Sequence, residues 1–232
     1  MISYVIRKDP YGFPPRDNTI LMFMQSEPSD HEKVLMSSPN PKPDLTTGDR
    51  DERISNIWFH AIAVGILRAS FEIYNGYISS WRQSLPFFPT QLDQLAAVSH
   101  EKMAPIHGGR SPFRVEFCGR VDERARKIAA ACIRDQAFRA CFDDTKLSGI
   151  RSALNSSNCT AMKKLRSALS KLERILGQFS RTCTKDPLLV MVFDEVSSLL
   201  DKDGRGGPYV ALNRLISCIS KDHHVWYFFS VY

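Results

Sequence analysis

The stretch LLVMVFDEVSSLL, from Leu188 to Leu200, is the part of the sequence on which the predicted fold depends. Six apolar residues lead into two adjacent carboxylates, Asp194 and Glu195. A continuous apolar run of this length, bounded by Pro187 and Asp194, is typical of a strand that is buried on both faces of a parallel sheet. Two interpretations of the acids follow: they end a nucleotide-binding strand, or they mark the point where a buried strand reaches water.

The residues after this stretch predict a helix and a second strand. The segment DKDGRGGP (201–208) has the composition of a loop, and YVALNRLISCISK (209–221) then carries leucines and isoleucines at helical spacing. The final VWYFFSVY (225–232) is predicted as a second buried strand. Strand, helix and strand in this order form one βαβ unit of a parallel sheet, so we predict an α/β unit over 184–232.

An apolar strand that ends in Asp-Glu is similar to the second nucleotide-binding signature of P-loop NTPases, the Walker B motif. In a parallel sheet, the carboxyl ends of the strands point into the ligand crevice. There Asp194 would hold Mg²⁺ through its water shell, and Glu195 would polarise the attacking water. The same resemblance implies that Ser230, at the end of the next strand, senses the γ-phosphate.

Two longer segments, DPLLVMVFDEVSSLL (186–200) and ALNRLISCISKDHHVWYFFS (211–230), together resemble a group of P-loop NTPase-like proteins that are common in fungi. The segment YGFPPR (11–16) is also similar to the N-terminal region of that group. The resemblance implies Mg²⁺ and ATP as cofactors of the site at Asp194. One departure is Val196, where that group usually has alanine.

The phosphate-binding half of such a fold is missing from the sequence. A P-loop needs the pattern G-x-x-x-x-G-K-[ST], whose backbone N–H groups surround the phosphates while the lysine neutralises them. No Gly-Lys pair is present, and the nearest match is APIHGGRS (104–111), with Arg110 in place of the lysine and Ser111 as the hydroxyl residue. A plain loop is the alternative. Because the sequence also ends at Tyr232, inside the second predicted strand, we expect a truncated or degenerate NTPase-like protein that does not hydrolyse ATP on its own.

The rest of the sequence predicts a largely helical protein. Residues 1–53 form an N-terminal segment whose second part is rich in Ser, Pro, Asp and Lys, as in a flexible linker. The helical region is 54–183, with helices expected at about 54–83, 91–103, 121–142 and 147–179, the last broken at NSSN. In that last helix apolar residues follow one another at three- and four-residue steps, which predicts an amphipathic helix lying on a core. These residues are Met162, Leu165, Leu169, Leu172, Leu176 and Phe179.

Positive charge is concentrated in one segment. Residues 145–185 contain nine Lys and Arg against one acid, Glu173, whereas the net charge of the whole chain is +6. Such a segment attracts phosphates, nucleic acid or an acidic protein, and a solvated helix face is the simpler alternative. The second interpretation of the protein is therefore a helical interaction module that binds an acidic protein or nucleic acid. The residues expected to do so point away from the apolar seam: Lys163, Lys164, Arg166, Lys171 and Arg174.

Composition excludes several further classes. The 232 residues are 43% hydrophobic and 24% charged, as in a globular protein with a sizeable core. Six cysteines without a C-x-x-C pair argue against a zinc site or a disulfide framework and indicate a reducing compartment. The N-terminus lacks the apolar core of a signal peptide, and the apolar stretch IWFHAIAVGIL (57–67) is too short to span a bilayer. We therefore expect an intracellular protein, cytoplasmic or nuclear, without membrane contact.

Overall fold

The computed structural model describes residues 19–25, 49–84, 91–103, 111–143, 147–179, 188–194, 207–220, 223 and 225–229. Within these ranges the chain forms helices and three short strands. The helices are α3 (Asp49–Ser84), α4 (Gln91–Met103), α5 (Pro112–Arg134), α6 (Gln136–Ala140), α7 (Leu147–Asn155), α8 (Thr160–Phe179) and α9 (Pro208–Ile219). The strands are β1 (Thr19–Gln25), β2 (Leu188–Asp194) and β3 (Val225–Phe229).

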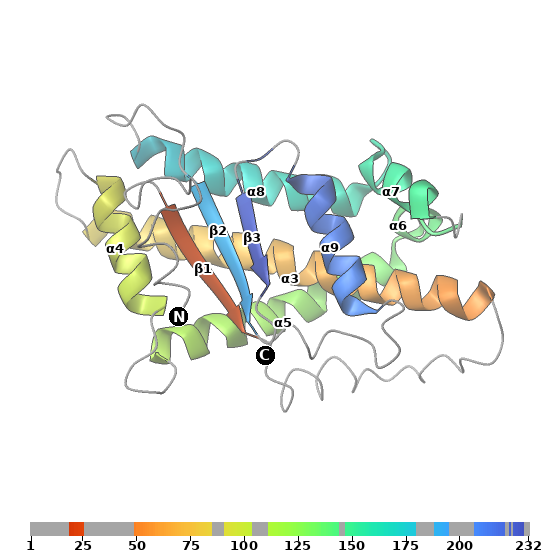
Figure 1. The fold of residues 1–232 in the computed structure, drawn as a ribbon, viewed down its shortest axis with the longest axis horizontal. Helices are drawn as coiled ribbons and strands as arrows, with labels where there is room; N and C mark the ends of the chain where they lie inside the picture. Colours follow the sequence, from red (N-terminus) through yellow and green to blue (C-terminus); the bar gives the residue numbers. More distant parts are fainter. Residues whose placement is uncertain are drawn as a thin grey trace.

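Helix α3 is the central element of the fold. It has 36 residues and runs along the long axis of the molecule, in contact with α5, α8 and α9 (Figure 1). The five consecutive residues from Ala61 to Gly65 are all buried. A helix that is apolar on every side must be surrounded by other elements, and α3 is apolar in this way over its middle turns.

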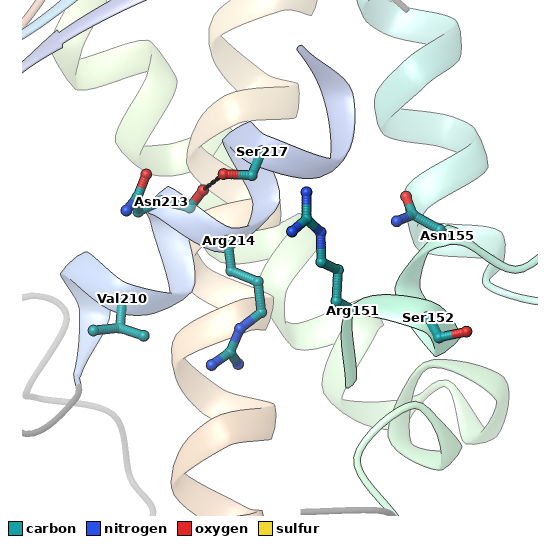
Figure 2. A pocket seen from close by; sticks show the side chains of 7 residues that line it. All are labelled: Arg151, Ser152, Asn155, Val210, Asn213, Arg214 and Ser217. Atoms are coloured by element: carbon teal, nitrogen blue, oxygen red, sulfur yellow. Dashed lines mark hydrogen bonds between the residues drawn. The ribbon is translucent and has the colours of Figure 1, made fainter. Parts of the chain in front are cut away.

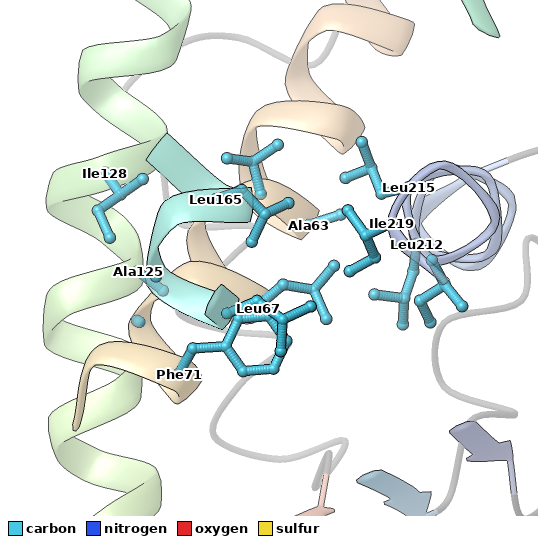
Figure 3. Close-up of a cluster of buried hydrophobic side chains, with 14 of the residues drawn as sticks. Ala63, Leu67, Phe71, Ala125, Ile128, Leu165, Leu212, Leu215 and Ile219 are labelled. Atoms are coloured by element: carbon cyan, nitrogen blue, oxygen red, sulfur yellow. The ribbon is translucent and has the colours of Figure 1, made fainter. Parts of the chain in front are cut away.

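The hydrophobic core lies between helices. Figure 3 shows side chains from α3, α5, α8 and α9 that meet in one cluster. Leu67 and Phe71 of α3, Leu165 of α8 and Leu215 of α9 are all fully buried. The buried seam of α8 confirms that this segment is an amphipathic helix lying on a core.

One end of the core is aromatic and is tied to α4 by a hydrogen bond. Tyr77 and Trp81 of α3 pack against the α5 ring of Phe113 in edge-on and tilted arrangements, with centroid distances of 4.7 and 5.4 Å. Tyr74, which is fully buried, forms a hydrogen bond between its hydroxyl and the Ser99 hydroxyl of α4. This contact joins two helices that are separated by a segment outside the described residues.

The predicted helices agree with the structure to different degrees. The helix at 91–103 and the break in 147–179 are confirmed, because α7 ends at Asn155 and α8 begins at Thr160. Helix α3 begins at Asp49, so the predicted linker does not extend to residue 53; its part at 26–48 lies outside the described residues. The third helix was placed wrongly: α5 begins at Pro112, after the N-cap Ser111, and ends where Asp135 caps α6.

The strands form a small parallel sheet in the order β1-β2-β3. Thr19 pairs with Leu188 at one end of the β1–β2 ladder, and Phe193 pairs with Phe229 at the end of the β2–β3 ladder. Leu189, Met191 and Phe193 alternate along β2 and are buried in the same cluster as the helices. Since alternate residues of a strand share one face, that face of β2 packs on the core.

The expectation of an α/β fold of P-loop type is wrong, and a helical fold takes its place. Helices make up most of the described residues, and the core is formed by the packing of α3 with α5, α8 and α9 rather than by a sheet covered on both faces. A P-loop connects a strand to a helix, but the described element that precedes Ser111 is the helix α4. The prediction gave the apolar run at 188–193 more weight than the longer helical segments that surround it.

Helix α3 also passes a simple test for a membrane span. The part from Glu52 to Trp81 is long and apolar enough to cross a bilayer. Within it, 61% of the most apolar 18-residue stretch is buried inside the fold. The central helix of a globular core has the same length and composition. These two properties alone therefore do not place α3 in a membrane.

Candidate anion-binding surface

The residues predicted for a nucleotide site are not brought together among the described residues. Asp194 is the last residue of β2, opposite Gln25 in the β1–β2 register. Glu195, Ser230 and Arg110 lie outside the described residues. Among the residues that the structure does describe, no three His, Cys, Asp or Glu side chains are grouped so that they could hold a metal ion.

Ser111, the predicted phosphate ligand, acts as the N-cap of α5. It is buried, and its Oγ accepts a hydrogen bond of 3.0 Å from the backbone N–H of Arg114. The same hydroxyl donates its proton to the carbonyl oxygen of Lys102 in α4. An N-cap serine followed by proline at the first helical position is a common start of a helix. The hydroxyl is therefore engaged within the protein, at the junction of α4 and α5.

The basic residues of α8 gather on the side opposite its buried seam. Four of them are exposed, and we call these residues the outer face of α8: Lys163, Lys164, Lys171 and Arg174. They follow the 3.6-residue period and span about 16 Å of the helix, at about 1.5 Å per residue. The N-terminal half is the more positive, because two lysines lie close to the end of the helix where its dipole is also positive. No acid stands in the first turn of α8 to offset this charge.

No described carboxylate neutralises the outer face of α8. Its single acid, Glu173, points to another neighbour: His223 Nδ1 lies 2.6 Å from Glu173 Oε2. Helix α5 shows the opposite arrangement, because four of its exposed cations are each within 3.0 Å of a carboxylate. These pairs are Arg120–Glu116, Arg124–Glu72, Arg126–Asp122 and Lys127–Glu123. The two helices have similar numbers of exposed cations, but only α8 presents them without acids.

Arg166 differs from the other basic residues of α8. It is half-buried at the edge of the helix, and its Nη2 donates a hydrogen bond of 2.7 Å to Oδ1 of Asn155 at the end of α7. It therefore faces the neighbouring helices rather than open solvent. Arg166 links the outer face of α8 to a cleft between α7 and α9.

Sequence analysis missed one cation of this region, Arg214 of α9. Helices α7 and α9 are in contact, and Arg214 lines the same cleft as Arg151 of α7. The only signal in the sequence is an arginine within the otherwise apolar helix PYVALNRLISCI. The importance of Arg214 depends on the contact between α7 and α9. Because Arg151 and Arg214 lie 63 residues apart in the sequence, no local pattern shows this contact.

The N-terminus of α8 is built around a pair of buried cysteines. The Cys159 sulfur accepts hydrogen bonds from the Cys141 thiol and from the backbone N–H groups of Met162 and Ala161, and these bonds lower the pKa of Cys159 against the effect of burial. The carbonyl oxygen of Ala137 lies 3.4 Å from the Cys141 sulfur and shares the single proton of this thiol with Cys159. The pair holds the start of α8 against the end of α6.

Comparisons with known proteins add no relative. The resemblance to fungal P-loop NTPase-like proteins therefore stays a prediction. No family model, no curated protein and no solved structure matches this chain.

Proposed function

We propose that the protein is a helical interaction module that binds an acidic protein segment through the outer face of α8. The observation that carries this proposal is the contrast between α8 and α5: exposed cations on α8 have no described carboxylate partner, whereas those on α5 are paired. Positive charges gathered on one face attract a negatively charged partner over a Debye length of about 10 Å.

The composition of the face favours an acidic protein over a nucleic acid. Proteins that bind single-stranded nucleic acids combine cations with aromatic side chains on which the bases stack. The exposed residues of α8 are Lys, Arg, Ser, Thr, Gly and Gln, without an aromatic side chain among those that the structure describes. Four lysine and arginine side chains at helical spacing match a row of Asp and Glu residues on a partner peptide.

The test measures binding of a fluorescein-labelled peptide rich in Asp and Glu by fluorescence anisotropy. The variant carries Lys163→Gln, Lys164→Gln, Lys171→Gln and Arg174→Gln. Each exposed ion pair contributes about 0.3–1 kcal/mol, so the four substitutions together should weaken binding by about ten- to a thousandfold at low salt. The affinity of the wild-type protein should also fall steeply as the salt concentration rises.

A matched control has the same change in net charge on α5. It carries Arg120→Gln, Arg124→Gln, Arg126→Gln and Lys127→Gln, which remove cations that are already paired. Equal loss of affinity in both variants would mean that net charge alone drives binding and would refute the proposal. Tighter binding of a single- or double-stranded oligonucleotide than of the acidic peptide, with the same dependence on α8, would assign the face to nucleic acid instead.

A further inference from the structure

An open cleft of about 610 Å³ lies between α7 and α9 (Figure 2). Its described lining residues include two arginines, polar amides and hydroxyls, and one apolar side chain, but no Asp or Glu. The residues are Arg151, Ser152, Asn155, Val210, Asn213, Arg214 and Ser217. In Figure 2 the Arg151 side chain extends into the space between α9 and Asn155, and the Arg214 guanidinium extends in the opposite direction.

Arg214 is held in place by a neutral partner. Its Nη1 lies 3.0 Å from Nε2 of His60, a buried residue of α3. Burial lowers the pKa of His60 to about 4, although a hydrogen bond from Nδ1 to the carbonyl of Asn56 opposes the shift. At neutral pH, His60 is therefore uncharged and accepts the hydrogen bond from Arg214. The arginine is fixed in orientation, and its positive charge is not neutralised by this contact.

Arg166 brings a third guanidinium to the same region. It holds Asn155, and the Asn155 side chain is also hydrogen-bonded to the Cys218 thiol of α9. Burial raises the pKa of this thiol, while Arg151, Arg166 and Arg214 all act to lower it. Three cations from three different helices thus act on one buried side chain. Arg166 and Arg214 are half-buried and form no ion pair among the described residues, which is unfavourable unless an anion supplies the missing partner.

We propose that the cleft between α7 and α9 is a binding site for a phosphate monoester. Arginine suits this ligand because its planar guanidinium donates two parallel hydrogen bonds to phosphate oxygens. Arg151, which is exposed and extends into the cleft, is the contacting residue, and Arg166 and Arg214 supply the surrounding positive field. The exposed amide of Asn213 and the hydroxyl of Ser152 are further donors on the two walls. The site is distinct from the outer face of α8 and goes beyond the proposed function, since it requires a defined group rather than a row of negative charges.

Isothermal titration calorimetry in about 150 mM salt tests this site, because surface attraction is largely screened there. The probes are an otherwise neutral peptide with one phosphoserine, its unphosphorylated twin, and phenyl phosphate as a free monoester. Arg151→Ala should weaken phosphate binding by about ten- to a hundredfold, the usual effect of losing a charge-assisted hydrogen bond. Arg151→Lys should restore only part of the affinity, because lysine lacks the planar fork. Arg126→Ala, at an exposed arginine paired with Asp122 on α5, is the matched control and should bind as the wild type does.

Each outcome decides the matter. Arg151-dependent binding of the phosphopeptide alone identifies a phosphorylated protein as the source, and equal binding of phenyl phosphate identifies a small monoester. No binding of either probe at millimolar concentration, or binding that Arg151→Ala leaves unchanged, would overturn the proposal. If the phosphopeptide binds but depends only on Lys163, Lys164, Lys171 and Arg174, the cleft is not the site and the proposed function of α8 stands. If the acidic peptide fails to bind while phosphate binding depends on Arg151, the reverse holds.

Discussion

Gly65 of α3 lies directly against the backbone of Ala125 in α5. A Cβ atom at position 65 would stand 2.5 Å from the carbonyl oxygen of Ala125 and 3.2 Å from its carbonyl carbon. Both residues are buried, and the neighbouring group is backbone, which cannot move aside as a flexible side chain can. The close approach of the two helices therefore requires glycine at this place.

We expect Gly65→Ala to destabilise the protein by about 1–3 kcal/mol, the range found for overpacked cores. The clash outweighs the gain of up to about 1 kcal/mol that alanine normally brings to a helix interior. Gly76→Ala is the matched control in the same helix, because a Cβ atom there would meet nothing within 4 Å. It should stabilise the protein slightly. Urea unfolding of the two variants measures both effects, and changes of the same sign would contradict this account of the contact.

The hydrogen bond between Tyr74 and Ser99 should make the effects of substituting these two residues on stability non-additive. Burial raises the pKa of the Tyr74 hydroxyl, with the bond to Ser99 opposing the shift, so the phenol stays protonated and needs a partner. Ser99→Ala should cost about 1–3 kcal/mol, because it removes the described partner of a buried hydroxyl. The double variant with Tyr74→Phe should cost less than the sum of the two single changes. Additive losses would show that the two hydroxyls do not interact.

His60 should make stability depend on pH between about 4 and 6.5. Its pKa in the folded protein is about 4, lower than the 6.5 of an exposed histidine, mainly because of burial. In this window the unfolded chain binds more protons, so stability is complete above pH 6.5 and falls as the pH decreases. The loss from this residue should reach about 2 kcal/mol by pH 5. The His60→Gln variant should lack this part of the pH dependence in unfolding experiments at pH 7 and pH 5, and equal slopes for both proteins would contradict the assignment.

Mg-ATP gives a direct test of the predicted nucleotide site. Because a Walker A motif is missing and Ser111 caps α5, we expect no ATP hydrolysis by this chain. Any rise of Tm with ATP should not require Mg²⁺ and should be unchanged by Asp194→Ala. If Asp194→Ala abolishes a Mg²⁺-dependent rise, or if hydrolysis occurs that Glu195→Gln removes, a nucleotide site exists at the end of β2 after all.

Local patterns predicted those parts of the fold that depend on local physics. The period of Met162, Leu165, Leu169 and Leu172 identified the buried seam of α8, and the polar NSSN segment identified the break before it. The start of α5 was also readable, since serine followed by proline is a helix-start signal at Ser111. The prediction missed it because the same residues were weighed as a phosphate loop.

The sequence could not show whether the core is formed mainly by the strands or mainly by the helices. A run such as 188–193 is compatible with the centre of a large sheet or with a short strand beside a helical core, because both bury apolar side chains. The exposure of Lys163, Lys164 and Lys171 followed from periodicity, but the arginine cleft did not. Arg151 and Arg214 line one cleft only because α7 packs against α9, a long-range contact that leaves no trace in the spacing of either segment.

The position of α3 has a consequence for how the protein opens. Because α5, α8 and α9 all pack on this single helix, its middle turns cannot unfold while those contacts persist. The amide protons from Ala61 to Phe71 should therefore exchange with solvent deuterium only when the whole core is disrupted, and at rates set by global stability. Because three helices share α3 as their packing partner, the protein should unfold as one cooperative unit rather than helix by helix.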